Sequence, residues 1–205
     1  MKLPIETEDQ LREIYGTPSD IVLKKQLTQL EHHSRRFIGL SPFVLVATSD
    51  GVRLDVSPRG DQPGFVQVET EQSLLLPDWP GNKRVDGLRN ILKHNYVGLI
   101  FLIPNVRETL RVNGTASIHA DTNLLERFQT DRGRIPLTVL RIQIKEVFLH
   151  CAKAFLRSNL WDPDSWPERS ALPSLAEMVR DQTKVDVPQE SDADMVARYR
   201  KKMWG

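Results

Sequence analysis

Hydrophobic and polar residues alternate with a period of two over several stretches of the chain, and this alternation predicts a mostly β protein. In the clearest stretch, polar residues separate Leu110, Val112 and Ala116, which is typical of a strand with one buried face. Residues 97–103 are apolar throughout, so both faces of that strand are covered, in the core or at a subunit interface. Six or more antiparallel strands in succession favour a barrel. The predicted strands fall within 43–47, 66–68, 73–76, 97–103, 110–119 and 141–149, with a bulge or bend at 147–149.

Apolar residues recur at helical spacing in other parts of the chain, which makes the expected fold α+β. This spacing predicts a helix over 19–36 and a second over 83–93, for which Asn82 is the expected N-cap. After a turn-rich linker, Ser174 and Ser191 each begin a helix through a capping pattern. The expected organisation is an N-terminal helical extension (1–37), a β-barrel domain (38–165) and a C-terminal helical extension (166–205).

Composition narrows the class of protein. The 205 residues carry 28 Lys and Arg against 27 Asp and Glu, so a net charge of +1 gives no general attraction to nucleic acid or to an anionic membrane. Cys151 is the only cysteine, which excludes an intrachain disulfide and a multi-cysteine zinc site. Neither a signal peptide nor a membrane span is visible, and we expect a cytoplasmic protein. No metal is expected, because His150 and Cys151 are adjacent on a predicted strand and point to opposite faces.

A basic turn precedes the second predicted helix. With Asn82 as N-cap, Lys83 and Arg84 fall in the first turn, where cations are disfavoured by the helix dipole by about 0.3–1 kcal/mol each. A bound anion would make the position of these cations favourable instead of unfavourable. Gly81 lets the chain approach a phosphate group closely. A solvated basic turn explains the same residues equally well.

Two further segments place cations where an anion can bind. Arg59 lies in a glycine-containing loop and can hold a phosphate with paired donors, or it can pair with Asp61 in a simple hairpin loop. Lys153 and Arg157 are four residues apart and share one face of a predicted helix, around an anion or as a solvated pair. Trp161 follows, either to stack on a flat ring or to pack in the core.

Four motifs, taken together and in this order, resemble the flavin-binding relatives of pyridoxamine 5'-phosphate oxidase. The resemblance covers about residues 38–165 and implies a split β-barrel that dimerises and binds FMN in a groove between its two subunits. The motifs are SPRGDQPGFV (57–66), PDWPGNKRVD (77–86), ETLRVNGTA (108–116) and HCAKAFLRSNLW (150–161).

The resemblance also implies roles for individual residues. Arg59 corresponds to an arginine that contacts the FMN phosphate, and Lys83 with Arg84 to a basic pair at the following helix. Arg111, and after it Lys153, are the candidates for stabilising the reduced flavin electrostatically. The implied FMN contacts are Arg59, Phe65, Val66, Asn82, Lys83, Arg84, Thr109, Arg111, Lys153, Arg157 and Trp161, the last three contributed across the subunit interface.

The end of the chain departs from the vitamin B6 oxidases. Their closing strand and substrate-gripping arginine segment are replaced by WDPDSWPERS and two helices, so oxidation of pyridoxamine phosphate itself is not expected. We expect a homodimeric FMN-dependent oxidoreductase that passes hydride between flavin N5 and a small soluble substrate. The alternative is a binding module that holds flavin or haem for storage, sensing or delivery. Since the cofactor breaks the bonds, no general base is assigned.

Overall fold

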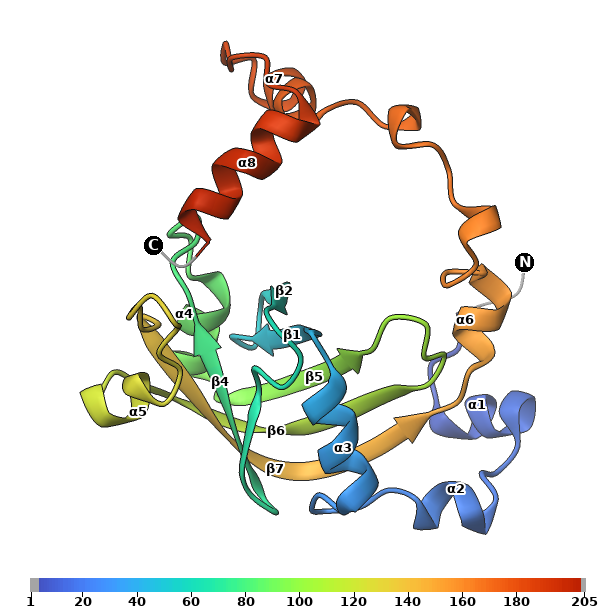
Figure 1. The fold of residues 1–205 in the computed structure, drawn as a ribbon. Helices are drawn as coiled ribbons and strands as arrows, with labels where there is room; N and C mark the ends of the chain where they lie inside the picture. The colour runs from blue at the N-terminus through green and yellow to red at the C-terminus, as the bar shows by residue number, and fades with distance from the viewer. Residues whose placement is uncertain (1–3, 204–205) are drawn as a thin grey trace.

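The computed structural model describes residues 4–203 and consists of a single antiparallel sheet of seven strands with flanking helices (Figure 1). The strand order is β2-β1-β5-β6-β7-β4-β3, and the sheet curls into a split β-barrel, which confirms the expected fold class. The strands are β1 (Phe43–Ser49), β2 (Leu54–Gly60), β3 (Gln67–Thr70), β4 (Ser73–Asp78), β5 (Tyr96–Leu102), β6 (Thr109–His119) and β7 (Thr138–His150).

The core fills the inner face of the curled sheet. Val44 of β1, Phe101 of β5 and Leu110 of β6 are neighbours in register and are almost fully buried. Alternate residues of the same strands face outward, as period-two patterning requires. The expected bulge lies earlier than 147–149, because the β6–β7 register shifts at Gly114, where any side chain would overlap the carbonyl oxygen of Gln143.

The predicted helix over 19–36 is wrong. The chain instead forms α2 (Asp20–Lys24), a short extended segment, and α3 (His32–Leu40). In that segment Leu27 makes two backbone hydrogen bonds with Val147 of β7, of 2.9 and 2.8 Å. This pairing with the sheet interrupts the helical pattern, and the carboxylate of Glu31 then caps the start of α3.

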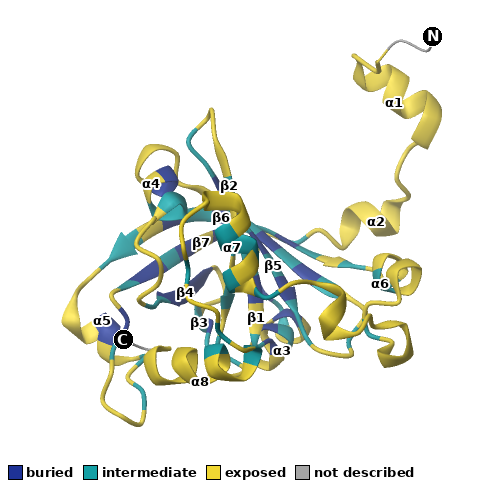
Figure 2. Cartoon of the chain, turned by 90° about the horizontal axis from the view of Figure 1, so that it is seen from above, coloured by how far each residue is buried: buried dark blue, intermediate teal, exposed yellow. Residues whose placement is uncertain are grey.

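Helices at both ends of the chain stand away from the sheet, α1 as seen in Figure 2 and α7 with most of α8 as seen in Figure 1. Within the described residues, α1 (Glu8–Tyr15), α7 (Leu175–Thr183) and α8 (Asp192–Lys202) contribute no buried residue. Ser174 and Ser191 cap α7 and α8 as predicted. None of the described helices combines the length and the apolar character needed to cross a bilayer. The remaining helices are α4 (Asp86–Lys93), α5 (Thr122–Glu126), α6 (Lys153–Ser158) and two 3-10 turns, Pro163–Ser165 and Arg169–Ala171.

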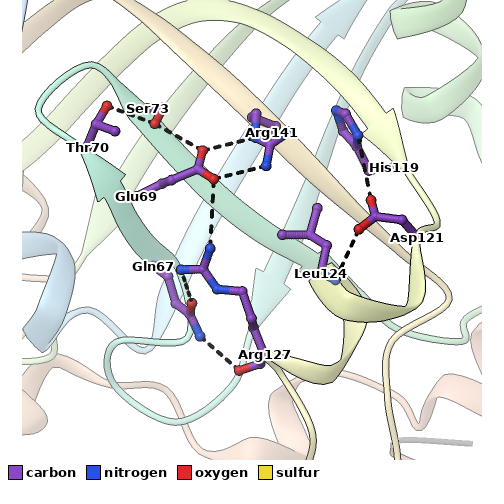
Figure 3. Close-up of polar contacts among 9 residues, drawn as sticks. All are labelled: Gln67, Glu69, Thr70, Ser73, His119, Asp121, Leu124, Arg127 and Arg141. Atoms are coloured by element: carbon purple, nitrogen blue, oxygen red, sulfur yellow. Dashed lines mark hydrogen bonds and ion pairs between the residues drawn. The ribbon is translucent and has the colours of Figure 1, made fainter.

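A polar cluster fastens the β3–β4 hairpin to the rest of the sheet (Figure 3). We name it the Glu69 cluster, made of Glu69, Ser73, Arg127 and Arg141. Both carboxylate oxygens of Glu69 accept hydrogen bonds of 2.9 Å from Arg141 on β7, and Arg127, after α5, lies 3.7 Å away. Ser73 donates to the same carboxylate, and Arg141 is the main reason that the pKa of Glu69 is lowered.

Candidate functional site

A cavity of about 810 Å³ lies between the end of β2, the loop after β4 and the start of α4, and we name it the β2–α4 cavity. Its volume falls in the range of about 300–1,000 Å³ usual for ligand pockets. The two stretches that the sequence predicts to converge, around residue 59 and around residues 83–84, both line it. Five predicted contact residues line the cavity: Arg59, Phe65, Asn82, Lys83 and Arg84.

Arg59 is held in place from several sides. It faces inward because it pairs in register with buried Val44. Its Nε donates to Asp78 Oδ1 at 2.9 Å, and its Nη1 donates to Ser57 Oγ at 3.0 Å and to the Pro58 carbonyl oxygen at 2.9 Å. Within residues 4–203 its Nη2 makes no hydrogen bond. One nitrogen of a fixed guanidinium, with its two N–H groups, therefore remains for a ligand.

The loop before α4 differs from its prediction. Helix α4 begins at Asp86, and its N-cap is Val85 rather than Asn82, so Lys83 and Arg84 lie before the helix and not in its first turn. Lys83 and Val85 adopt left-handed backbone conformations, with φ of 64° and 50°, which helical residues cannot adopt. Asn82 Oδ1 instead accepts from the Arg84 backbone N–H at 3.0 Å and closes a tight turn.

Two residues that sequence reasoning missed also line the cavity, Asp78 and Trp79. The indole N–H of Trp79 is buried and has no partner within the described part of the chain. A buried donor without an acceptor is costly, and a ligand oxygen can satisfy it. Both residues lie inside the motif PDWPGNKRVD, so their place in the chain was the available signal.

The cavity is not uniformly positive. Arg59 pairs with Asp78, and Arg84 Nε donates to Asp86 Oδ2 at 2.7 Å. An anion that binds here must therefore compete with carboxylates for the same cations. The charged side chains that line the cavity are Arg59, Lys83 and Arg84 together with Asp55, Asp61, Asp78 and Asp86.

The remaining predicted contacts on the barrel lie elsewhere in this chain. Val66 is buried in the core with 2% exposure. Thr109 lies on β6, the central strand of the sheet, where it pairs in register with His150 of β7. Arg111 lies between buried Leu110 and Val112, so it faces outward, whereas Arg59 faces inward.

A second group of charged side chains surrounds Arg111 on that outer face. Arg111 hydrogen-bonds Glu146 and lies 5.1 Å from the centre of the Phe148 ring, and Lys25 lies 4.3 Å from the same ring. Burial, followed by these two cations, lowers the pKa of His150 and favours its neutral form.

The three predicted contacts after β7 belong to α6 and the turn that follows. Lys153 and Arg157 lie one helical turn apart in α6 and are exposed. The indole N–H of Trp161 donates to the Val106 carbonyl oxygen at 2.9 Å, and its ring stacks on Phe155 at 5.4 Å. Within this chain, then, Trp161 packs against Phe155. None of these three residues lines the β2–α4 cavity.

One group of possible metal ligands occurs among the described residues, formed by Glu31, His32 and His33 at the start of α3. The carboxylate of Glu31 already accepts backbone hydrogen bonds of 2.7 Å from His33 and from Ser34. The group thus caps a helix, at the end where the helix dipole opposes a cation.

The fold defines the protein as a split β-barrel. A family model described as pyridoxamine 5'-phosphate oxidase matches residues 30–151, more than half of the chain, so the chain belongs to that family. No curated protein matches the sequence at a significant level.

Several solved structures resemble the fold at low sequence identity. HupZ of Group A Streptococcus is 18% identical over 58% of this chain and 93% of its own, with a TM-score of 0.47. General Stress Protein 26 of Bacillus anthracis is 14% identical over 58% and 94%, with a TM-score of 0.43. An FMN-binding protein of Syntrophomonas wolfei is 14% identical over 69% and 92%, also with a TM-score of 0.43.

Proposed function

We propose that this protein is a homodimeric FMN-dependent oxidoreductase that acts on a small soluble substrate. The observation that carries the proposal is the convergence of Arg59, Lys83 and Arg84 on one cavity. A guanidinium with fixed geometry and two nearby cations suit the dianionic phosphate of a mononucleotide. FMN, when bound, supplies hydride transfer at its N5 atom.

The cavity residues fit such a group in complementary ways. Arg59 Nη2 and the exposed Arg84 and Lys83 supply donors for phosphate oxygens. The buried N–H of Trp79 lacks an acceptor within residues 4–203, and Phe65 supplies an aromatic edge to the same space. These residues bind and orient; no described side chain is assigned a proton transfer.

The proposed dimer explains why Arg111 lies apart from Arg59. The two arginines belong to opposite faces of one sheet, so they can approach the same ligand only if a second copy contributes one of them. The outer face near Arg111 carries exposed apolar side chains, among them Phe43, Val56 and Tyr96, which a second copy would cover. Lys153 is assigned to the partner's ligand because the family resemblance implies it, and because Lys153 does not line the β2–α4 cavity of its own chain.

A haem-binding role is less well supported than a flavin-binding role. Haem iron is held by His, Cys, Met or Tyr side chains. Among the described residues that line the β2–α4 cavity, Met203 is the single member of that set. The charged residues of the cavity favour a phosphate-bearing ligand instead.

Purified protein titrated with FMN tests the proposal. Flavin fluorescence should be quenched on binding, and Arg84→Ala should weaken binding by about 1.5–3 kcal/mol, the range for hydrogen bonds to charged groups. Arg53→Ala is the control, because Arg53 is an exposed arginine in the turn between β1 and β2 and does not line the cavity. Wild-type protein that neither contains nor binds FMN would refute the proposal.

Turnover and assembly need separate measurements. Anaerobic addition of a reduced nicotinamide cofactor should bleach bound FMN if nicotinamide is the donor, and a flavin that no donor reduces would indicate a binding module. The 23.5 kDa chain should sediment as a dimer. Val56→Asp should produce monomers, whereas Val185→Asp, an exposed valine in the loop after α7, should not.

A further inference from the structure

Asp78 places a negative charge directly against the arginine that the proposed function assigns to phosphate binding. Its carboxylate is largely shielded, with 15% of the side chain exposed, and Arg59 beside it is 27% exposed. We propose that Asp78 is a positioning residue that fixes the guanidinium of Arg59 for phosphate, an inference that rests on the proposed function. Charge alone predicts the opposite role, in which the carboxylate of Asp78 competes with the phosphate for Arg59.

The geometry of the guanidinium supports this role. Nε donates to Asp78, and Nη1 donates to Ser57 Oγ and to the Pro58 carbonyl oxygen, so three hydrogen bonds hold the planar group at two of its nitrogens. Because a guanidinium is rigid, fixing Nε and Nη1 also fixes the direction of Nη2. A long side chain loses rotamer entropy when it is ordered, and here that ordering precedes binding.

The topology of the barrel also supports this role. Arg59 lies on β2, one edge of the sheet, and Asp78 is the last residue of β4, beside the opposite edge strand β3. β2 and β4 are not neighbours in the sheet order, so the ion pair spans the split of the barrel. Asp78 thereby connects Arg59 on β2 to the end of β4, from which the loop with Lys83 and Arg84 begins.

The second ion pair of the cavity provides a contrast. Arg84 pairs with Asp86 only two residues away, and 74% of its side chain is exposed. This pair lies within one loop and does not span the split of the barrel, and the arginine that it orders is exposed. The carboxylate of Asp86 therefore acts mainly by competing with the phosphate for Arg84. Removing Asp86 should therefore leave FMN binding as tight as before or tighter, the reverse of the effect expected at Asp78.

The test compares the affinities of two probes, FMN and riboflavin, which differ by the phosphate. In Asp78→Ala the affinity for FMN should fall about 10-fold, equivalent to about 1.4 kcal/mol, and the affinity for riboflavin should stay nearly constant. Asp78→Asn keeps an oxygen that can accept from Nε and should recover most of the loss. Ser57→Ala, a milder change, should lower FMN affinity by a smaller factor, and Asp86→Ala is the control.

The possible outcomes separate the two claims. A wild-type protein that does not bind FMN overturns the proposed function and the role of Asp78 with it. Wild-type binding combined with equal or tighter FMN binding in Asp78→Ala overturns the positioning role alone. Equal losses for FMN and riboflavin would show that Asp78 only maintains the fold. If Asp78→Ala does not fold, unchanged FMN affinity in Ser57→Ala counts against positioning, and a selective loss of FMN supports it.

Discussion

The Glu69 cluster and the β2–α4 cavity contain the same chemical groups but satisfy them differently. In the Glu69 cluster, two arginines and a serine surround one carboxylate, whose oxygens are all occupied. In the cavity, Arg59 keeps one nitrogen without a hydrogen bond and Trp79 keeps a buried N–H without an acceptor, as far as the described chain shows. A saturated cluster stabilises a fold, whereas spare donors around an open volume suit a ligand.

The position of each cluster in the barrel accounts for this difference. Glu69 and Arg141 lie on β3 and β7, which flank β4 within the continuous part of the sheet. Arg59 and Asp78 face each other across the split, where no strand pairing fills the space between them. The open edge of the barrel thus creates room for a ligand, and the closed part does not.

The largest expected effect is on stability, at Glu69. Glu69→Ala leaves Arg141 and Arg127 without their shared, partly buried acid, and should lower the free energy of unfolding by about 2–4 kcal/mol. Urea unfolding followed by circular dichroism measures this loss. Glu71→Ala is the control, because Glu71 is exposed and pairs with Arg35 at the surface. Equal losses in the two variants would remove the distinction between a buried and a surface pair.

Arg59→Ala should give the reverse pattern. FMN affinity should fall by about 1.5–3 kcal/mol, while the free energy of unfolding of the ligand-free protein falls by only about 1 kcal/mol. Fluorescence titration and urea unfolding on the same preparation measure both quantities, and Glu69→Ala should retain its FMN affinity. A large stability loss with unchanged affinity would make Arg59 a structural residue like Arg141.

The pH dependence of stability distinguishes the Glu69 cluster further. The hydrogen bonds from Arg141 lower the folded-state pKa of Glu69, so its stabilising effect is complete above the unfolded-state pKa of about 4.3. This effect is lost as the pH falls through the lower folded-state value. The stability difference between wild type and Glu69→Gln should be constant from about pH 7 to pH 5 and should shrink below about pH 4. A constant difference down to pH 3 would contradict this assignment.

Most strands follow directly from the sequence, because alternation reports burial on one face wherever a strand has one. The starts of α7 and α8 follow as well, at Ser174 and Ser191, but other helix boundaries do not, because tertiary contacts set them. Leu27 fits a helical pattern but pairs with Val147, a residue far away in the chain. Val85 is a β-branched residue with φ of 50°, a conformation that no local rule predicts for it.

Some residues of the candidate site could likewise be predicted from the sequence, and others could not. Arg59, Lys83 and Arg84 could be found because phosphate chemistry favours cations beside glycines, and the cavity brings them together. Asp78 could not be assigned, since its role depends on the closing of β4 against β2, which sequence spacing does not show. The convergence of Arg111 with the cavity stays a prediction that needs a second subunit.

The smallest effects are expected at the two tryptophans. Trp79→Phe removes an N–H that has no partner within residues 4–203, so ligand-free stability should change by less than about 0.5 kcal/mol. If FMN provides the acceptor, affinity should fall by about 1 kcal/mol. Trp161→Phe removes an N–H that donates to the Val106 carbonyl, and should cost about 1 kcal/mol of stability. Its FMN affinity should stay unchanged if Trp161 only packs, whereas a loss of affinity would place Trp161 at the flavin, where the family resemblance implies it.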